Sequence, residues 1–367
     1  MSKSIFDKKR VFILSPQTWD FNMLSKHHYA IELANSGAKV SYIYSIGGQN
    51  SRKLVSIKKV AENINNVTFF RIFFSNNSNL KLAINKLLEF IQINILILFL
   101  GRPDVVWSFD QNRFINVKYF RAKKIIFHPV DYIIAANSNK MKIAKESDYI
   151  FSVSNEILND FHNQSATQAV INHGLSENFL SINNPPMPDF IEKNKINIGY
   201  VGTISNKHID WDILFKIIDN HPNSNFVFIG YYVFDSNIEK LQQRKNVKLT
   251  GKIEIEILPS CMSYFDMFLT SYKTINNKIL TSNSHKILEY LSTGKVIVTN
   301  FFSYYENHQD LLSMVIDNND LPSKFKNVIE NLDKYNSVEL SNKRKTFAKD
   351  NTYKKQLNRI ELIISDI

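Results

Sequence analysis

The sequence of 367 residues has a single cysteine, Cys261, no internal repeat and no low-complexity tract. One cysteine excludes a disulfide framework and a zinc site built from cysteines, and it is typical of a reducing compartment. Long hydrophobic runs are also missing: the most apolar one, Phe90–Leu100, is shorter than the ~20 residues that span a bilayer. We expect this run to be the buried end of a helix rather than a membrane-contacting face.

Acidic residues are in deficit, with 34 Asp and Glu against 45 Lys and Arg, so the net charge is +11. This excess suggests nucleic acid, membrane lipid or a phosphorylated small molecule as partner. Because the cations are not gathered with aromatic residues on one element, we expect no nucleic-acid partner. Their clusters, mostly in the N-terminal half, favour peripheral attachment to an anionic inner leaflet: Lys8–Arg10, Arg52–Lys53, Lys58–Lys59, Arg121–Lys124 and Lys343–Lys345.

The overall composition is that of a globular protein. Apolar residues make up 44% and charged residues 22%, which excludes a disordered or fibrous protein. The first apolar run, Val11–Leu14, is too short for the core of a signal peptide, so we expect a cytoplasmic protein. At ~150 residues per domain, the length suggests two domains.

Short apolar runs alternate with helix-length segments along both halves of the chain. In the first half, strands are expected over 10–15, 39–45, 104–108, 124–127, 149–153 and 170–171, with a helix over 25–36 that ends at Gly37. In the second half, strands are expected over 196–201, 225–229, 247–249, 267–269 and 296–299, with helices over 210–220, 238–244 and 286–292. This alternation predicts parallel sheets covered on both faces.

The segment Asn183–Pro188 can continue neither a helix nor a sheet, so it indicates a linker. The sequence therefore predicts an α/β protein with two Rossmann-like domains, 1–182 and 196–337, joined by a hinge over 183–195. A basic helical segment over 338–367 follows. Because ligands bind beyond the carboxyl ends of strands in such sheets, we expect a phosphate site in a cleft between the domains.

The segment Gly199–Ser205 places Gly202 directly after a strand and ahead of a helix. A glycine there lets backbone N–H groups approach an anion, and the N-terminus of the following helix favours negative charge. The segment matches neither the dinucleotide fingerprint nor the P-loop, and a purely structural strand-ending glycine is the alternative.

Two patterns that resemble metal sites have simpler interpretations. Asp210 and Asp212 have D-x-D spacing, but they open a helix, where carboxylates cap free N–H groups. His27 and His28 are adjacent in a helix and do not share a face. We therefore expect no metal.

The segment Ser284–Thr299, with the sequence SHKILEYLSTGKVIVT, indicates a loop, a helix that ends at Gly294 and a strand. Lys286 and Glu289 share one face of that helix near its start. A lysine there can pair with a diphosphate, and the carboxylate can accept hydrogen bonds from two ribose hydroxyls. An ordinary Lys–Glu surface pair is the alternative.

This segment resembles the K-x-x-E-Y-L-A-x-G-K-P-V-V segment of the GT-B nucleotide-sugar glycosyltransferases, closest to the branches that build bacterial capsules, exopolysaccharides and lipopolysaccharides. Other stretches resemble that family in the same order: Trp19-Asp20, His128–Asp131, Ser147–Ser154, Val170–Leu175, Gly199–Ser205, Phe226–Gly230 and Gly251–Pro259. The resemblance implies the GT-B fold, two Rossmann-like domains facing each other across a cleft. It also implies transfer of a sugar from a nucleoside-diphosphate donor to a glycan or lipid-linked acceptor, with no further cofactor.

The resemblance assigns donor binding to the C-terminal domain, at Gly202, Thr203, Lys207, Gly230, Ile253, Ser284, Lys286 and Glu289. Gly202, Thr203 and Lys286 correspond to the residues at the diphosphate, and Glu289 to the residue that holds the ribose. The stretches at Gly230 and Ile253 lie where the family holds the nucleobase. A lysine and N–H groups at the departing diphosphate would allow catalysis without a metal.

The resemblance assigns acceptor binding to the N-terminal domain, together with the catalytic base of inverting members. Asp131 is the first candidate for this base, since an ionised carboxylate needs no special tuning; His128 is the second and Asp20 the third. A helix or turn cap is the alternative role for Asp131.

Two departures from the family leave retention or inversion of the sugar open. Many retaining members have two glutamates eight positions apart, but Thr281 stands eight before Glu289. They also have an arginine after the loop glycine, where this chain has Thr203, so that Lys207 or His208 would supply part of that charge. An epimerase of the same fold and a non-catalytic basic protein that binds membrane or nucleic acid are the alternative functions.

Overall fold

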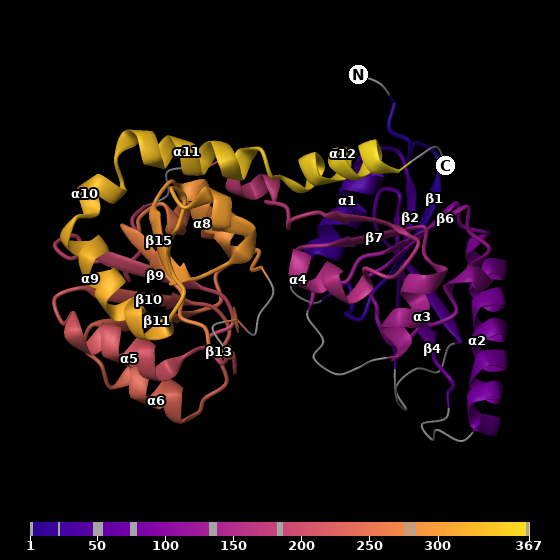
Figure 1. The fold of residues 1–367 in the computed structure, drawn as a ribbon, viewed down its shortest axis with the longest axis horizontal. Coiled ribbons are helices and arrows are strands. Elements are labelled where there is room, and N and C mark those ends of the chain that lie inside the picture. Colours follow the sequence, from indigo (N-terminus) through magenta and orange to yellow (C-terminus); the bar gives the residue numbers. More distant parts are fainter. Residues whose placement is uncertain are drawn as a thin grey trace. The chain divides into compact units, whose positions relative to one another are not determined.

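The structure is a computed structural model that describes residues 3–20, 23–46, 54–73, 79–131, 138–181, 186–275, 278–279, 283–364 and 367. It consists of two α/β units, each with its own parallel sheet (Figure 1). The first unit is Met1–Asn172 together with Tyr353–Ile367, and the second is His173–Thr352. The expected α/β class with two Rossmann-like units is confirmed.

The sheet of the first unit has eight strands in the order β3-β4-β2-β1-β5-β6-β7-β8. The strands are β1 Arg10–Leu14, β2 Lys39–Ile46, β3 Val55–Ala61, β4 Ile64–Phe70, β5 Val105–Ser108, β6 Lys124–Phe127, β7 Tyr149–Ser152 and β8 Thr167–Val170. Neighbouring strands pair in parallel, except for the antiparallel hairpin of β3 and β4. This hairpin was not predicted from the sequence; its turn has Asn63 in the left-handed region, at a φ of 59°.

Helices cover both faces of this first sheet: α1 Ser25–Asn35, α2 Asn79–Leu100, α3 Ser138–Glu146, α4 Asn155–Leu158 and α12 Tyr353–Ile363, with the short 3₁₀ helices η1 Val117–Phe120 and η2 Asn159–Phe161. Alternate residues of β1 enter two separate apolar clusters, as the two-residue period of a strand requires. Val11 and Ile13 pack with residues of α1 and α12. Phe12 and Leu14 pack with residues of α2 and α3 on the other face.

Helix α2 differs from the prediction for Phe90–Leu100, which the sequence analysis took as the buried end of a helix. That run is the second half of a helix of 22 residues, of which only Gln92, Ile93 and Leu96 are buried. Among the described residues, α2 is the one helix that is long and apolar enough to cross a membrane by length and composition, with 17% of its most apolar stretch buried. The expectation of a buried segment was wrong.

The sheet of the second unit has six parallel strands in the order β11-β10-β9-β12-β15-β16. They are β9 Asn197–Val201, β10 Asn225–Ile229, β11 Val247–Gly251, β12 Met267–Leu269, β15 Val296–Asn300 and β16 Ser313–Val315, and a separate short pair is formed by β13 Thr274–Ile275 and β14 Lys278–Ile279. The helices are α5 Trp211–Asn220, α6 Ser236–Gln242, α7 Leu258–Met262, α8 Lys286–Thr293, α9 Leu321–Glu330, α10 Leu332–Tyr335 and α11 Val338–Lys349, with 3₁₀ helices η3 Glu177–Phe179, η4 Ser303–His308 and η5 Asn318–Asp320.

The units differ in extent from the ranges that the sequence analysis proposed. Residues 173–182 belong to the second unit, and so does α11, whereas α12 belongs to the first. Of the proposed hinge over 183–195, residues 183–185 lie outside the described residues, and so do Arg52–Lys53 of the basic clusters.

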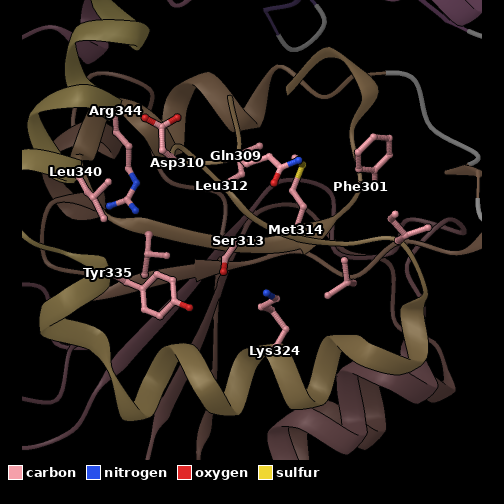
Figure 2. Close-up of a pocket in the computed structure, with 13 residues that line it drawn as sticks. Phe301, Gln309, Asp310, Leu312, Ser313, Met314, Lys324, Tyr335, Leu340 and Arg344 are labelled. Carbon is pink, nitrogen blue, oxygen red and sulfur yellow. The ribbon is translucent and has the colours of Figure 1, made fainter. Parts of the chain in front are cut away.

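A cavity of about 390 Å³ lies at the β16 edge of the second sheet. Figure 2 shows its lining side chains, among them Lys324 of α9, Tyr335 of α10 and Arg344 of α11. The buried Arg344 guanidinium donates hydrogen bonds to the carbonyls of Leu311 (3.1 Å) and Gly294 (3.1 Å), and so joins α11 to the end of α8. Its role is structural, and none of the predicted donor residues lines this cavity.

Candidate functional site

Three glycines end neighbouring strands at the carboxyl edge of the second sheet: Gly202 after β9, Gly230 after β10 and Gly251 at the end of β11. Gly202 has a φ of 141° and Gly230 a φ of 146°, a region that residues with a Cβ avoid. A Cβ on Gly230 would overlap the carbonyl oxygen of Gly202. The chain therefore needs glycine at Gly202 and Gly230 to bring these two loops into contact.

The ammonium of Lys286 lies directly against Gly202. A Cβ on Gly202 would overlap both Nζ and Cε of Lys286, so only a glycine leaves room for this side chain. Lys286 is the first residue of α8, and its side chain is buried. The predicted association of Gly202 with Lys286 therefore has a direct steric basis.

Tyrosine side chains hold Lys286 in place. Its Nζ donates a hydrogen bond to the Tyr200 hydroxyl (3.1 Å), which in turn donates to the Thr203 carbonyl (3.2 Å). Burial lowers the pKa of Lys286, but the hydroxyl oxygens of Tyr200, Tyr272 and Tyr290 raise it by more, so that the side chain is cationic at neutral pH. Burial raises the pKa of Tyr200 to about 12, so this hydroxyl is neutral there. These tyrosines carried no signal in the sequence analysis because they reach Lys286 from other elements.

Glu289 lies one turn after Lys286 on α8 and is partly exposed. Its carboxylate makes no hydrogen bond or ion pair with any described residue. Burial raises its pKa to about 7, although the charge of Lys286 lowers it. The pair is therefore not an ordinary surface ion pair, and the Glu289 carboxylate is left to accept hydrogen bonds from a ligand.

The free backbone N–H groups are not those that the sequence analysis expected. The N–H of Gly202 donates to the Ile229 carbonyl (2.8 Å), and that of Ile204 donates to the Tyr231 carbonyl (2.8 Å). Between them, the N–H of the exposed Thr203 has no acceptor among the described residues. Gly202 thus supplies space for Lys286, whereas Thr203 supplies a donor for an anion.

The expected helix N-terminus is also a different one. Helix α5 begins nine residues after Gly202, and Asp210 caps it by accepting a hydrogen bond from the N–H of Ile213 (3.3 Å). This confirms the capping interpretation of Asp210. Helix α8, which begins with Lys286 itself, has no side-chain cap, but the N–H groups of Ile287 and Leu288 donate to the carbonyls of Ser284 (3.1 Å) and His285 (3.2 Å). The start of this helix therefore favours an anion near Lys286 through its dipole rather than through these two donors.

The loops after β9 and β10 are tied together, because Ser205 Oγ accepts from the Val233 N–H (2.6 Å) and donates to the Val233 carbonyl (2.9 Å). This pairing presents Tyr231 and Phe234, 51% and 65% exposed, beside Gly230. Lys252 lies 5.6 Å from the Tyr231 ring centroid. These aromatic rings were not among the predicted donor residues, although the YYVF run after Gly230 is their visible signal.

The remaining predicted donor residues lie in loops of the second unit. Ser284 is in the loop before α8, and Ile253 is in the loop after β11, where it packs against the core. Lys207 is exposed in the loop between β9 and α5. Thr281, which replaces a family glutamate, lies outside the described residues.

In the first unit, Asp131 and Asp20 are both exposed in loops that follow strands, β6 for Asp131 and β1 for Asp20. Burial lowers the pKa of Lys26 to about 8, and the nearby charge of Asp131 opposes this shift in part. The carboxylate of Asp110, which is ion-paired with Arg113 (3.0 Å), acts on Lys26 in the same way as Asp131. Lys26, Asp110 and Arg113 carried no signal in the sequence, since two separate segments, α1 and the loop after β5, bring them together.

His128, the second candidate for the base, is enclosed by aromatic rings. It is 1% exposed, its Nδ1 accepts a hydrogen bond from Trp107 Nε1 (3.3 Å), and its ring centroid lies 5.0 Å from that of Phe109. A ring held in this way is not accessible to a ligand from solvent, whereas the side chain of Asp131 is exposed.

The two adjacent histidines of α1 have separate structural roles. The Nε2 of His27 lies 2.9 Å from the Tyr42 hydroxyl, and the His28 ring stacks on Tyr353 at 4.4 Å between centroids. Among the described residues, no group of three His, Cys, Asp or Glu side chains is arranged to hold a metal ion.

Known proteins of this fold were found through structure alone. No protein-family model matches the sequence, and no curated protein matches it significantly. Sucrose-phosphate synthase from Thermosynechococcus elongatus has a TM-score of 0.72 at 10% identity, over 97% of this chain and 98% of that chain. Anabaena HepE in complex with UDP has a TM-score of 0.69 at 13% identity, over 98% of this chain and all of that chain. A glycosyltransferase from Rickettsia africae has a TM-score of 0.70 at 14% identity, over 98% of both chains.

This chain has the GT-B fold. The match extends over nearly its whole length, so the fold class that the sequence resemblance implied is confirmed.

Proposed function

We propose that this protein is a nucleotide-sugar glycosyltransferase that adds a sugar to a glycan or lipid-linked glycan in the synthesis of a bacterial surface polysaccharide. It would act in the cytoplasm and without a metal. UDP is the first nucleotide to test, because structurally similar proteins were crystallised with UDP or UDP-glucose.

One observation carries this proposal: Lys286 lies against Gly202, and one turn away is the carboxylate of Glu289, which has no partner in the part of the chain that the structure describes. A buried cation beside a free N–H group at Thr203 suits a diphosphate, because both are fixed before the ligand arrives. A carboxylate at the distance of one helical turn suits the two hydroxyls of a ribose. Tyr231 and Phe234 would then contact the nucleobase.

The same groups account for the chemistry of the donor half-reaction. When the bond from the sugar to the diphosphate breaks, negative charge grows on the phosphate oxygens, and Lys286 and the Thr203 N–H stabilise it. On the acceptor side, Asp131 would remove the proton of the attacking hydroxyl. The side chain of Lys26 lies near that carboxylate.

Nucleotide binding tests the donor site. We expect UDP, among UDP, GDP, CMP and their sugars, to raise the melting temperature of the wild type, and Lys286→Ala and Glu289→Ala to abolish this rise. Lys295→Ala, at the opposite end of α8, is the matched control and should respond like the wild type. If no nucleotide stabilises the wild type or gives heat in calorimetry, the proposed function fails.

The raised pKa of Glu289 predicts a pH dependence. Between pH ~4.5 and ~7, the folded protein holds a proton on Glu289 that the unfolded chain has lost, so stability declines as pH rises through this range. Ribose hydroxyls favour the ionised carboxylate, so UDP binding should release this proton and tighten by about tenfold from pH 6 to pH 8.

The variant Glu289→Gln distinguishes the proton of Glu289 from a proton that the UDP phosphate itself can lose. The variant should lose most of the pH dependence of UDP binding measured by calorimetry. Its free energy of unfolding should also be about 1–2 kcal/mol higher than that of the wild type at pH 8 and equal to it at pH 4. This figure allows for the partial exposure of the carboxyl. Equal pH profiles for the two proteins would show that Glu289 does not titrate at the nucleotide.

A further inference from the structure

Helix α2 presents an apolar face that no described part of the first unit covers. Leu80, Leu87 and Ile91, with Leu98 further along, recur at spacings of four or seven and so share one side of the helix. Leu80 is 72% exposed, Leu87 59% and Leu98 82%. Figure 1 shows α2 at the margin of the first unit.

The opposite face of α2 is fixed to the protein. Ile93 and Leu96 pack into the cluster around Phe12, and Gln92 Nε2 donates to the Ile72 carbonyl (2.9 Å). Glu89, the only acidic residue of α2, accepts hydrogen bonds from the N–H groups of Ile115 (2.6 Å) and Asn116 (3.0 Å). The outward face therefore carries no negative charge.

Because α2 is the connection between the parallel strands β4 and β5 and lies along their sheet, it cannot also cross a bilayer. A membrane would contact only the outward face, with the helix lying parallel to the lipid surface.

Cations surround this face. Lys81 and Lys86 flank the apolar side chains on α2 itself, while Arg121 Nη2 donates to Asn94 Oδ1 near its second half. A hollow of about 400 Å³ is lined by Phe99 and Leu100 at the end of α2. The basic side chains of Arg10, Lys39 and Lys59 line it as well. Eight cations around α2 form no ion pair with any described acidic residue: Lys81, Lys86, Arg102, Lys118, Arg121, Arg10, Lys39 and Lys59.

The positive charge around α2 favours lipid over a second copy of the chain as the occupant of its outward face. If two copies packed through α2, in either orientation, they would bring these unpaired cations together, and like charges at close range repel. An anionic bilayer instead attracts each cation and accepts the apolar side chains. The long stems of Lys81 and Lys86 can lie along the apolar surface with the ammonium groups at the headgroups.

We propose that the outward face of α2 is a membrane-docking surface that inserts into the interface of an anionic bilayer. This inference does not depend on the proposed activity, since it concerns another surface and another ligand. It gives the hypothesis of peripheral attachment, which the net charge alone suggested, a specific set of residues.

Sedimentation of the full-length protein with vesicles tests the proposal. We expect at least tenfold tighter binding to phosphatidylcholine vesicles with 30% phosphatidylglycerol than to pure phosphatidylcholine, and weaker binding as salt is added. The double variant Leu87→Asp/Leu98→Asp should lose at least tenfold. Both side chains are exposed, so the variant should keep the melting temperature of the wild type. Leu362→Asp, at an 88% exposed leucine of α12, is the matched control and should bind normally.

The charge is tested separately. Lys81→Gln/Lys86→Gln should weaken binding to the anionic vesicles by about tenfold, whereas Lys216→Gln/Lys245→Gln in the second unit should not. Equal binding of the wild type to both kinds of vesicle, or normal binding by Leu87→Asp/Leu98→Asp, would overturn the proposal. A dimer in analytical ultracentrifugation that this variant abolishes, without vesicle binding, would assign the face to a second copy.

Discussion

Gly202→Ala should weaken UDP binding at least 100-fold while the protein still folds. The new Cβ would occupy the position of Lys286 Nζ and Cε, so the ammonium must leave the place where it is fixed for a diphosphate. Gly202 also has a φ of 141°, where a Cβ strains the backbone, and we expect the free energy of unfolding to fall by about 2 kcal/mol. Calorimetric titration with UDP and denaturant unfolding measure the two effects.

Gly251→Ala is the matched control for strain. Gly251 ends the strand next to β10 and has a φ of 73°, but a Cβ on it would meet no atom within 4 Å. This variant should lose about 1 kcal/mol of stability through its backbone and bind UDP as the wild type does. If Gly202→Ala binds UDP normally, the contact of Gly202 with Lys286 has no part in donor binding.

Asp131→Asn should lower the turnover of sugar transfer by about 10³-fold and leave UDP binding unchanged. An amide cannot take the proton of the acceptor hydroxyl, and general-base catalysis contributes effects of about this size. Release of UDP from the donor sugar in the presence of acceptor measures turnover. Slow hydrolysis without acceptor, in which water replaces the hydroxyl, gives a second measurement that needs no identified acceptor.

Asp131 also lies near Lys26, so a loss of turnover needs a control for charge. Glu62→Gln removes an exposed carboxylate from the turn of the β3–β4 hairpin and should leave turnover unchanged. A loss in Asp20→Asn with normal turnover in Asp131→Asn would instead assign the base to Asp20. Normal turnover in both variants would exclude a carboxylate base at these two positions.

Parallel strands buried on both faces were predictable from sequence almost to the residue. The expected bounds for β6, β10 and β12 are those of the structure, because each strand is a continuous apolar run between polar segments. The β3–β4 hairpin was missed because Lys58 and Lys59 interrupt the apolar pattern of β3 at the exposed edge of the sheet. Asn63 after Glu62, between two runs rich in β-branched residues, was its available signal.

What covers an apolar face could not be predicted from its pattern. The periodicity of residues 90–100 predicts one apolar side of a helix. It does not show whether protein or a membrane lies against that side. For the same reason, Lys286 and Glu289 were identified from their spacing on one helix, whereas Tyr200 and Tyr272 were not. Those side chains meet Lys286 only because β9 and the segment after β12 end beside α8 in the folded sheet.

The return of the chain to the first unit has a consequence for biosynthesis. Tyr353 of α12 stacks on His28 and its hydroxyl donates to Ser25 Oγ (3.1 Å), while Leu357 and Ile360 are buried beside α1. A ribosome makes α12 after the whole second unit, which takes about 10–40 s at ordinary rates of translation. During that interval α1 packs on the sheet but lacks its contacts with α12. The first unit to emerge is therefore the last to be completed.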